Sequence, residues 1–593
     1  MSEQLTTHYR QFSCGELTDS QVGKKVILSG WAARVRDHGG VLFVDLRDRY
    51  GKTQVVFEPE NKPVYEKAKE LRNEWVIQVT GSVRLRPENS RNLNLKTGLV
   101  EVVATEITIL NAAQALPFQI EGTEEVNEDL RLKYRFLDLR KEALQQKIIL
   151  RSQMTQSIRD YFHKQQFVEV ETPVLMKSTP EGARDFLVPS RVNPGKFFAL
   201  PQSPQTYKQI LMVSGFDRYF QIVKCFRDED LRADRQPEFT QVDIEMAFVD
   251  QEDIQNVSEG MVKQLFREIL NVDVKTPFPR MDFEEAMHVY GSDKPDLRNP
   301  LKIQEIRFTA PTGFKVFDSM SEEGSLISGI RVPAPLVLSR NLYDDMVDRY
   351  KKGGLAGLIL FRMGEQLEGP VVKHLTPEAI SNLVRTFGLA AGDQLLLSTG
   401  AGYKYMTIMG NLRQELGRHF NLIDEKAYSF HWVTNFPLLD WDEEEKRWVA
   451  MHHPFTSPRN EDMDKMGTDS GSIRAKAYDL VLNGSEIAGG SIRIFKPELQ
   501  SKMFELLGIG PEEAKEKFGF LLDAFKYGAP PHGGIAFGLD RLAMIMTQSS
   551  SIRDVIAFPK NSNAQSLMDS APSGVAEKQL RELYIRSTWN PDK

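Results

Sequence analysis

Clusters of polar and charged residues that suggest a functional site fall into two blocks of this chain. A long stretch between the blocks holds no such polar cluster. The first block ends near residue 248 and the second runs from residue 430 to residue 558. Between about residues 295 and 425 the chain is rich in glycine and alternates β and helical signals. A chain of 593 residues is too long for one hydrophobic core. We therefore predict one functional fold that is interrupted by an inserted domain and then resumes.

The first hundred residues predict a small β-barrel. Glycines separate five short apolar or β-branched runs, at residues 26–28, 42–44, 55–57, 76–79 and 100–110. A helix is expected at residues 63–73. Five strands with one inserted helix is the count of an OB-fold, whose exposed face binds single-stranded nucleic acid in many proteins.

Composition excludes several classes of protein. Cys14 and Cys225 are the only two cysteines, so neither a disulfide framework nor a structural zinc site is supported. Residues 1–7 lack the pattern of a secretory signal, and no apolar run approaches the roughly 20 residues of a membrane helix. The cytosol is the expected compartment. The net charge of −7 disfavours nonspecific coating of phosphates, so any nucleic-acid contact should be confined to part of the surface.

Residues 167–175 predict a strand that ends at Pro173. This strand follows residues 144–162, where apolar side chains recur at helical spacing. Proline has no backbone donor and a fixed φ, which suits an edge or an interface. An ordinary strand end has the same signature.

Residues 226–248 combine a charged turn with an alternating strand. The polar positions of the strand share one face: Phe239, Gln241, Asp243 and Glu245. A solvated sheet face would give the same alternation. The neighbouring turn, however, carries Arg227, Arg232 and Arg235, and arginine binds phosphate or carboxylate through two hydrogen bonds. Acids beside arginines suit an anionic nucleotide together with an amino group.

Residues 533–541 form a glycine-rich segment that runs into an apolar helix. Its spacing matches neither a Walker A loop nor a Rossmann fingerprint. Glycines permit close backbone approach, and Arg541 near the helix start is placed to meet a phosphate or stack on a base.

These three segments, in this order, resemble motifs 1, 2 and 3 of the class II aminoacyl-tRNA synthetases. Four further segments look like the bacterial aspartyl enzymes of the aspartate/asparagine/lysine subgroup: residues 179–190, 199–205, 290–298 and 451–458. The resemblance covers essentially the whole chain. It implies an ATP-dependent, AMP-forming ligase that activates L-aspartate and transfers it to the 3′ end of tRNA(Asp), with Mg²⁺ as cofactor. It also implies a homodimer with Pro173 at the interface and no membrane partner.

The same resemblance implies an α+β multidomain fold. Its parts are an N-terminal OB-fold anticodon-binding barrel (1–111), a hinge (112–140), an antiparallel-sheet catalytic domain in two parts (141–294 and 426–560), an inserted α/β domain (295–425) and a C-terminal extension (561–593).

The aspartate pocket implied by the resemblance consists of Glu181, Ser203, Gln205, Lys208, Arg227, Asp243, His452 and Arg493. Arg493 and Lys208 would bind the side-chain carboxylate of aspartate, whereas a lysine-specific relative would need acids there. Glu181 and Gln205 would accept hydrogen bonds from the substrate ammonium. A solvated helix position is the alternative for Lys208. We interpret His452 as a substrate-contacting lid residue rather than a general base.

The implied ATP site consists of Arg227, Asp228, Glu229, Gln236, Glu486, Gly538, Leu539, Asp540 and Arg541. The two catalytic arginines would hold the nucleotide, Arg227 at the α-phosphate and Arg541 at the γ-phosphate. Asp479 and Glu486 would hold Mg²⁺ through oxygen ligands, although a spacing of seven also fits two helical turns or a bend between strands.

In the barrel, Phe43 and Gln54 match family positions that contact the anticodon by stacking and by base-edge hydrogen bonds. Arg34, Arg36 and Arg84 are expected to bind phosphates.

Two barrel positions correlate in the family with discrimination between tRNA(Asp) and tRNA(Asn). His38 matches the relaxed enzymes, where discriminating enzymes carry Leu. Asn89 matches neither the Lys of discriminating enzymes nor the Gly of relaxed ones. We therefore predict charging of tRNA(Asn) as well as tRNA(Asp). A strictly discriminating enzyme is the alternative, with His38 as a solvent-exposed loop residue.

Two other classes share parts of this pattern. A tRNA-independent paralogue such as an asparagine synthetase typically lacks the N-terminal barrel. An OB-fold nucleic-acid-binding protein with a decayed synthetase core should have lost motif arginines, yet Arg227, Arg493 and Arg541 are in place.

Overall fold

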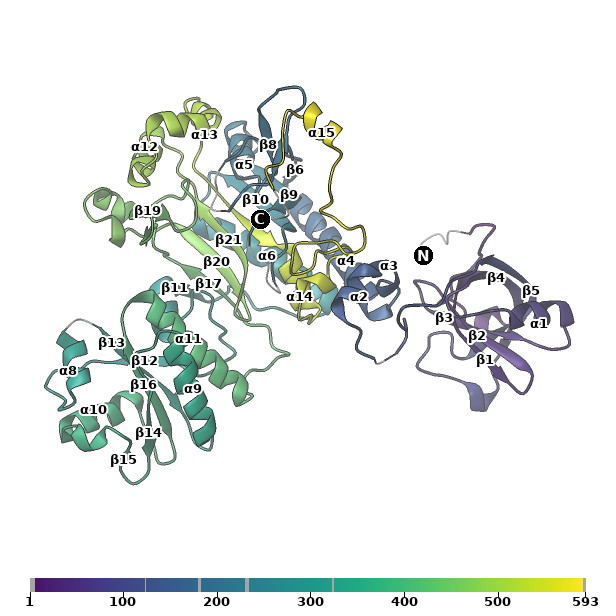
Figure 1. Ribbon diagram of the computed structural model, residues 1–593, viewed down its shortest axis with the longest axis horizontal. Helices are drawn as coiled ribbons and strands as arrows, with labels where there is room; N and C mark the ends of the chain where they lie inside the picture. The colour runs from purple at the N-terminus through teal and green to yellow at the C-terminus, as the bar shows by residue number, and fades with distance from the viewer. Residues whose placement is uncertain (1–5, 123, 180–182, 230–233, 323–324, 590–593) are drawn as a thin grey trace. The chain divides into compact units, whose positions relative to one another are not determined.

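Figure 1 shows the computed structural model, which describes residues 6–122, 124–179, 183–229, 234–322 and 325–589. The chain divides into two units. One comprises Met1–Ile149 with Arg553–Ser573, and the other comprises Leu150–Ile552 with Gly574–Lys593. No helix within the described ranges has the length and apolar character needed to cross a membrane.

The first unit contains a closed five-stranded barrel in the order β1-β2-β3-β5-β4, which confirms the predicted OB-fold. Its elements are β1 (Lys25–His38), β2 (Val41–Arg47), β3 (Lys52–Phe57), α1 (Lys62–Lys69), β4 (Val76–Leu85) and β5 (Val100–Asn111). Along β2, Leu42, Val44 and Leu46 are buried in the barrel core, while Phe43 between them is only partly buried. The alternation of the sequence therefore places Phe43 on the outer face.

Outside the barrel, the first unit brings the segment that follows the barrel into contact with residues 553–573 near the end of the chain. Two helices follow the barrel, α2 (Glu128–Lys133) and α3 (Arg135–Asp138); α4 (Glu142–Lys164) comes next, and most of it, from Leu150 on, belongs to the second unit. Buried Arg135 donates hydrogen bonds to the carbonyl oxygens of Arg553, Ile556 and Ala557. These contacts fix the segment after η7 (Ile552–Asp554) against α3.

An eight-stranded sheet organises the second unit, in the order β11-β17-β20-β21-β22-β10-β9-β6. Neighbouring strands are antiparallel except for the β11–β17 and β6–β9 pairs. The strands are β6 (Val168–Glu169), β9 (Arg218–Phe226), β10 (Glu238–Ala247), β11 (Arg280–Asp282), β17 (Phe430–Thr434), β20 (Ala477–Leu482), β21 (Ser485–Ile492) and β22 (His532–Gly538). The sheet thus combines strands from both sides of the predicted insertion.

Helices and small hairpins surround this sheet. They are α5 (Gln205–Val213), α6 (Gln251–Leu270), α7 (Phe283–Glu285), η3 (Ala286–Tyr290), α12 (Pro497–Leu506), α13 (Pro511–Phe525), α14 (Leu539–Met546) and α15 (Glu577–Glu582), with the hairpins β7 (Leu187–Pro189)–β8 (Phe197–Ala199) and β18 (Leu439–Asp442)–β19 (Arg447–Ala450). The strand predicted at residues 167–175 is shorter than expected, because the chain leaves the sheet after Glu169 and Pro173 is exposed.

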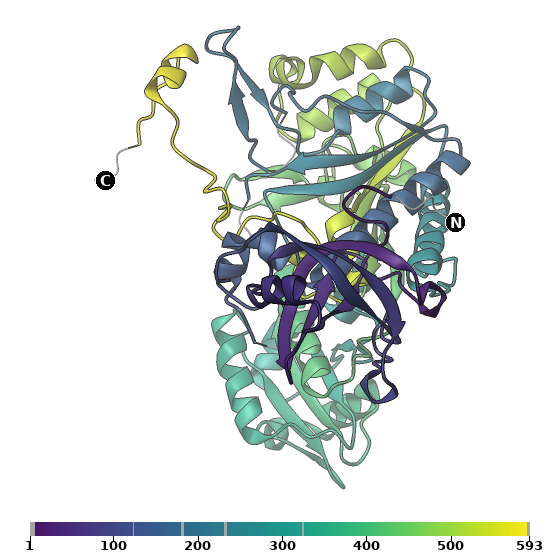
Figure 2. The same ribbon diagram turned by 90° about the vertical axis from the view of Figure 1, so that its right-hand side faces the viewer.

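The inserted region forms its own α/β layer around a five-stranded sheet in the order β12-β13-β16-β14-β15. Its elements are β12 (Ile303–Ile306), α8 (Lys315–Glu322), β13 (Leu326–Val332), α9 (Arg340–Lys352), β14 (Ile359–Met363), β15 (Leu367–Glu368), α10 (Pro377–Phe387), β16 (Gln394–Gly400) and α11 (Gly402–His419). In Figure 1 this domain lies beyond the β11–β17 edge of the large sheet, and Figure 2 shows its sheet and helices, in teal, from the side.

Close strand approach makes Gly490 a test of this sheet. A Cβ on Gly490 would lie 2.2 Å from the carbonyl oxygen of Gly534 on β22. We expect Gly490→Ala to destabilise the second unit by about 1–3 kcal/mol, because an added methyl group in a fully packed interior forces neighbouring atoms to shift. Thermal unfolding followed by calorimetry measures the change.

Gly519→Ala provides the control. This glycine lies within α13, and a Cβ there would meet the Lys515 side chain at 3.6 Å, an ordinary contact. Stability equal to or above that of the unaltered protein is expected, because alanine favours helix. Equal stability of the two variants would contradict the strand packing described here.

Candidate active site

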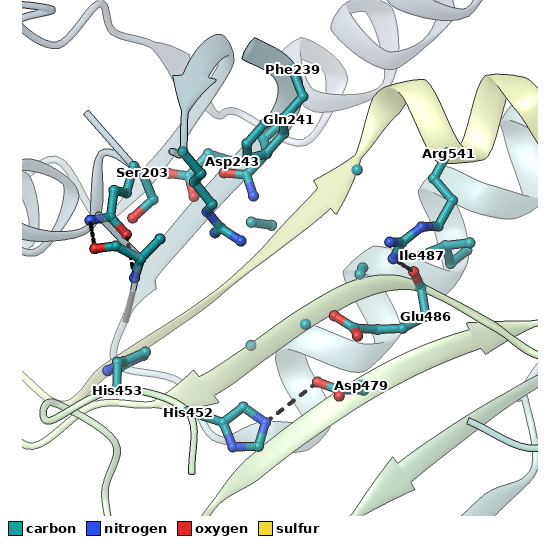
Figure 3. Close-up of a pocket in the computed structure, with 18 of the residues that line it drawn as sticks. Ser203, Phe239, Gln241, Asp243, His452, His453, Asp479, Glu486, Ile487 and Arg541 are labelled. Carbon is teal, nitrogen blue, oxygen red and sulfur yellow. Dashed lines mark hydrogen bonds and ion pairs between the residues drawn. The ribbon is translucent and has the colours of Figure 1, made fainter. Parts of the chain in front are cut away.

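A cavity of about 550 Å³ opens on the face of the eight-stranded sheet (Figure 3). Side chains from β10 and α5 meet side chains from β20, β21 and the start of α14 there. Residues of both chemistry-bearing blocks of the sequence therefore line one site. Of the predicted residues, the cavity is lined by Ser203, Gln205, Lys208, Arg227, Glu229, Gln236, Asp243, His452, Asp479, Glu486, Arg493, Gly538, Asp540 and Arg541.

The floor at one end of the cavity consists of buried acids. Asp243 and Glu245 on β10 are both fully buried, so the alternative of a solvated sheet face is wrong. Lys208 of α5 is also buried, and the solvated-helix alternative for it is wrong too. Its Nζ lies 2.6 Å from Asp243 Oδ1 and 3.2 Å from Glu245 Oε2. Gly534 makes room for this arrangement, because a Cβ there would lie 1.9 Å from Glu245 Oε2.

Arg493 completes this group of charges. Its Nε and Nη2 donate to the two carboxylate oxygens of Glu245 at 3.0 and 3.1 Å. Its Nη1 lies 2.6 Å from His453 Nε2 and 2.7 Å from Ser491 Oγ. Burial and the Arg493 charge lower the pKa of His453 well below its usual value. His453 is therefore neutral and accepts the Arg493 hydrogen bond through Nε2.

The two floor acids differ in charge compensation. Burial alone would raise the pKa of Glu245, but Arg493 and Lys208 lower it. Burial raises the pKa of Asp243, despite the opposing charge of Lys208. Asp243 Oδ2 has no hydrogen-bond partner among the described residues. Lys208 supplies the counter-charge at Oδ1, and Oδ2 is open to a hydrogen bond from a further donor such as an ammonium.

Ser491 was not predicted as a site residue, and Glu245 and His453 were given no specific role in the predicted pockets. For Glu245 a signal existed, because it shares the polar face of β10 with Asp243. His453 follows His452 directly, but nothing in the sequence distinguishes the roles of the two rings. Predicted Glu181 lies outside the described residues.

Arginines lie at the other end of the cavity. The guanidinium carbon of Arg227 is 5.1 Å from the centroid of the Phe239 ring, and Arg227 Nε has no partner among the described residues. Arg541 donates to the backbone oxygen of Glu486, and its Nη2 lies 3.2 Å from Asp234 Oδ2. Figure 3 shows the Arg541 side chain extending toward Glu486.

Three predicted nucleotide-binding residues have other surroundings. Asp540 is buried, pairs with Arg151 of α4 and accepts a 2.7 Å hydrogen bond from the Thr240 amide. Its carboxylate fixes the turn that presents Arg541. Exposed Asp228 and buried Leu539 are not among the residues that line the cavity.

Asp479 and Glu486 face each other across β20 and β21 and suit a hard cation. The Asp479 charge, together with burial, raises the pKa of Glu486. A Cβ on Gly489 would lie 2.9 Å from Asp479 Oδ1 and 3.3 Å from Glu486 Oε1, so both oxygens occupy the space a side chain would fill. Within the described ranges no three His, Cys, Asp or Glu residues gather as a metal site. Two carboxylates that leave positions for water and phosphate oxygens are the set Mg²⁺ prefers beside a nucleotide.

His452 lies next to this pair. Its Nε2 is 3.6 Å from Asp479 Oδ1 (Figure 3). Its ring packs edge-on against Phe436. Its Nδ1 is buried and has no hydrogen-bond partner within the described part of the chain.

The predicted nucleic-acid residues gather on the outer face of the barrel. Gln54 Nε2 donates to Glu101 at 2.8 Å, and Arg84 Nε contacts the other oxygen of Glu101 at 2.8 Å. Arg36 pairs with Asp45, the residue opposite Gln54 on β2. Arg34 is exposed on β1.

The two predicted discrimination residues lie in exposed parts of the barrel. His38 ends β1, and its ring centroid is 6.2 Å from that of Phe43. Asn89 belongs to η2 (Glu88–Ser90).

Exposed apolar side chains cluster in sequence around Pro173. Val168, Val174 and Leu175 are 45, 48 and 51% exposed. A run of exposed apolar residues is a feature of protein interaction surfaces.

Comparisons with known proteins agree with this architecture. Residues 127–562 match the family described as tRNA synthetases class II (D, K and N), and residues 26–110 match the OB-fold nucleic acid binding domain. A protein of Geotalea uraniireducens (strain Rf4) named aspartate–tRNA(Asp/Asn) ligase is 53% identical over 98% of both chains. A protein of the same name from Aquifex aeolicus (strain VF5) is 50% identical over 98% of this chain and 100% of its own.

Solved structures share the fold. Asparaginyl-tRNA synthetase from Pyrococcus horikoshii, complexed with asparaginyl-adenylate, superposes with a TM-score of 0.59 over 93% of this chain and 98% of that chain, at 19% identity. The whole chain, from barrel to motif 3, is matched by its relatives. It belongs to the class II tRNA synthetases of the D, K and N group.

Proposed function

We propose that this protein is an aspartate–tRNA ligase. It activates L-aspartate with ATP to aspartyl-adenylate, releases pyrophosphate, and transfers the aspartyl group to the 3′ end of tRNA. One observation carries the proposal: the fully buried group of Lys208, Arg493, Asp243 and Glu245 at one end of the cavity. The printed name of the 53% identical relative supports it.

Aspartate fits this group of charges in one orientation. Its ammonium approaches Asp243, whose Oδ2 lacks a partner among the described residues, and Gln205 of the cavity lining. The resemblance assigns Glu181 to the same ammonium, but this residue lies outside the described residues. Its side-chain carboxylate approaches Arg493 and Lys208. Ser203 and His452 line the space between. A lysine substrate would bring a second cation against two buried cations and be rejected.

The nucleotide lies across the arginine end. Arg227, beside the Phe239 ring, contacts the α-phosphate, and Gln236 and Glu229 line the neighbouring wall. Arg541, fixed through Asp540 and Glu486, contacts the γ-phosphate. The Gly538 turn allows the nucleotide to approach the backbone, whereas Asp228 and Leu539 do not line the cavity and are given no contact with the nucleotide. Mg²⁺ held by Asp479 and Glu486 would neutralise phosphate charge.

Chemistry then requires positioning rather than a protein nucleophile. The aspartate α-carboxylate attacks the α-phosphorus in line, and the bond to pyrophosphate breaks. Arg227 and Arg541 stabilise charge on the phosphoryl oxygens as it develops. In the second step the terminal 3′-hydroxyl of tRNA attacks the carbonyl carbon of the mixed anhydride, AMP leaves, and a phosphate oxygen of the adenylate accepts the proton. His452 closes over the substrate as a lid residue.

Arg493→Lys tests the amino-acid pocket. Lysine keeps the charge but loses the two-pronged contact, so kcat/KM for aspartate in ATP–pyrophosphate exchange should fall about 100-fold, or about 2.7 kcal/mol. ATP binding, followed by fluorescence titration, should be unchanged. Arg447→Lys, at a 49% exposed side chain on β19, is the control and should match the unaltered enzyme. Normal activation of aspartate by the Arg493 variant would refute the pocket assignment.

We further propose that the barrel reads the anticodon of tRNA(Asp) and also accepts tRNA(Asn). Phe43 offers a ring for stacking, Gln54 offers hydrogen bonds to a base edge, and Arg34 and Arg36 offer phosphate contacts. His38 next to Phe43 and the uncharged Asn89 support the relaxed choice. The printed name of the Geotalea relative includes both tRNAs. We place this activity in the cytoplasm.

His38→Leu tests the relaxed choice. The unaltered enzyme should aminoacylate purified tRNA(Asn) with aspartate at a rate within about tenfold of tRNA(Asp), a difference of about 1.4 kcal/mol. The variant should lose most tRNA(Asn) charging and keep tRNA(Asp) charging. His8→Leu, near Ser29 at the other end of β1, is the control. Discrimination against tRNA(Asn) by several orders of magnitude in the unaltered enzyme would show that His38 does not set the choice.

We also propose an isologous homodimer that buries the apolar residues around Pro173. Light scattering at micromolar concentration should give about twice the 67.5 kDa chain mass. Leu175→Asp should give monomer, because a carboxylate would be desolvated in the interface. Leu93→Asp, at an 84% exposed leucine of the barrel, should remain dimeric. A monomeric unaltered protein would exclude this assembly.

A further inference from the structure

The segment that enters the inserted domain also reaches the nucleotide end of the cavity. It runs from Gly291, after η3, to β12. Asp293 of this segment lines the cavity. The Nζ of Lys294 lies 3.2 Å from Asp293 Oδ2, and the Lys294 side chain is 44% exposed and thus open to a ligand. None of the functions described above uses these two residues.

On one side, the segment contacts the turn that carries the carboxylate pair. Gly484 lies in the turn between β20 and β21, two residues before Glu486. A Cβ on Gly484 would lie 2.9 Å from Asp296 Cβ. The segment therefore lies directly against the turn between Asp479 and Glu486.

On the other side, the segment contacts α11 of the inserted domain through glycines. A Cβ on Gly410 would lie 2.1 Å from the carbonyl oxygen of Gly291, and one on Gly417 would lie 2.3 Å from Asn299 Nδ2. Gly291 itself has φ +66°, the left-handed region that favours glycine. The backbone of the segment and the helix are thus packed as closely as the chain permits.

Arg413 of α11 fixes the course of the segment. Its guanidinium is buried and donates to three carbonyl oxygens, those of Leu301 at 2.5 Å, Asp296 at 2.9 Å and Asn299 at 2.6 Å. Burial lowers the pKa of Arg413 to about 10. A buried cation without an acid partner in these contacts is retained because three backbone dipoles stabilise it.

We propose that Lys294 binds the β- and γ-phosphates of ATP and the departing pyrophosphate, and that Arg413 of the inserted domain is the positioning residue that holds the Lys294 segment there. The inference rests on the proposed function for the identity of the nucleotide site. Its geometric basis is the placement of the segment between α11 and the turn that precedes Glu486. The β- and γ-phosphates of ATP would lie beside Asp479 and Glu486, the carboxylates proposed to bind Mg²⁺. Lys294 supplies a positive charge on the same side of the cavity.

Binding measurements on the full-length protein with Mg²⁺ test the role of Lys294. Lys294→Gln should weaken binding of a non-hydrolysable ATP analogue about tenfold, the worth of one charge-assisted contact, and leave AMP binding unchanged. In ATP–pyrophosphate exchange the KM for ATP and for pyrophosphate should rise, with the KM for aspartate unchanged. Lys302→Gln, at an exposed lysine further along the same segment, should have no effect.

A double-mutant cycle tests Arg413. Arg413→Met keeps most of the side-chain volume and removes the three donors, so binding of the analogue should weaken while AMP binding is kept. Adding Lys294→Gln to this variant should then cause much less than a tenfold further loss. Full additivity, or equal weakening of AMP and analogue, would reduce Arg413 to a structural role and overturn that part of the inference. If Arg413→Met fails to fold, Arg413→Lys, which keeps one donor, replaces it.

Two outcomes separate this inference from the proposed function. Analogue binding by Lys294→Gln equal to that of the unaltered protein would refute the phosphate role, whether or not aspartate is activated. Selective loss of triphosphate binding would support it even if the unaltered enzyme activated another amino acid, because the binding measurement contains no amino acid.

Discussion

Two cations and two carboxylates share one dry site at the end of the cavity, and much of the second unit is arranged around them. Transfer of a single ion into a protein interior costs several kcal/mol, and removal of one partner from a buried pair costs about 3–5 kcal/mol. Lys208 with Asp243 and Arg493 with Glu245 must therefore be assembled together. The four side chains come from α5, from β10 and from the end of β21, which the sheet must hold in register.

The neighbours of this group show how the register is maintained. Gly534 on β22 leaves space for the Glu245 carboxylate. The neutral His453 ring accepts a hydrogen bond from Arg493 through Nε2, which a protonated ring cannot do. Both oxygens of Glu245 are paired with Arg493, whereas Asp243 Oδ2 has no hydrogen-bond partner among the described residues, so one carboxylate oxygen of the group is open to a donor. In the proposed complex the ammonium of aspartate would meet Asp243 and its side-chain carboxylate would meet Arg493 and Lys208. That second contact is one that only an acidic amino acid can make, and it would be a physical basis for selectivity.

Local patterns in the sequence predicted the barrel and the insertion, whereas most of the cavity lining was implied by the resemblance to the class II synthetases. The interruption between the two chemistry-bearing blocks predicted the insertion, whereas the role expected of Phe43 came from the family resemblance, since a phenylalanine in a strand more often belongs to the core. The sequence did not decide the structure where one local pattern is compatible with two environments. Polar alternation on β10 fits a wet face as well as a buried one, and the choice depends on Arg493, which lies 248 residues after Glu245. Likewise, no local feature reveals that Arg413 binds the backbone at Asp296, 117 residues earlier. Residues 167–175 were assigned too long a strand, because the pairing with β9 ends before Pro173 removes a backbone donor.

The point of insertion explains how the large sheet accepts an additional domain. β11 precedes the insertion and β17 follows it, yet the two strands pair in parallel, with Met281 opposite Val433. Their pairing joins the two ends of the insertion within one sheet. The entropic cost of closing such a loop grows slowly with its length, by about 0.6 kcal/mol for each doubling, so a folded domain of this size is tolerated at that position. A merely tolerated insertion needs no specific contact with the rest of the fold. Here α11 packs glycine against backbone at Gly291 and commits a buried arginine to the entering segment. Close packing of this kind transmits a displacement of α11 to the turn before Glu486, since a rigid interior deforms little. The inserted domain is therefore connected to the nucleotide end of the cavity by close packing, through α11 and the entering segment.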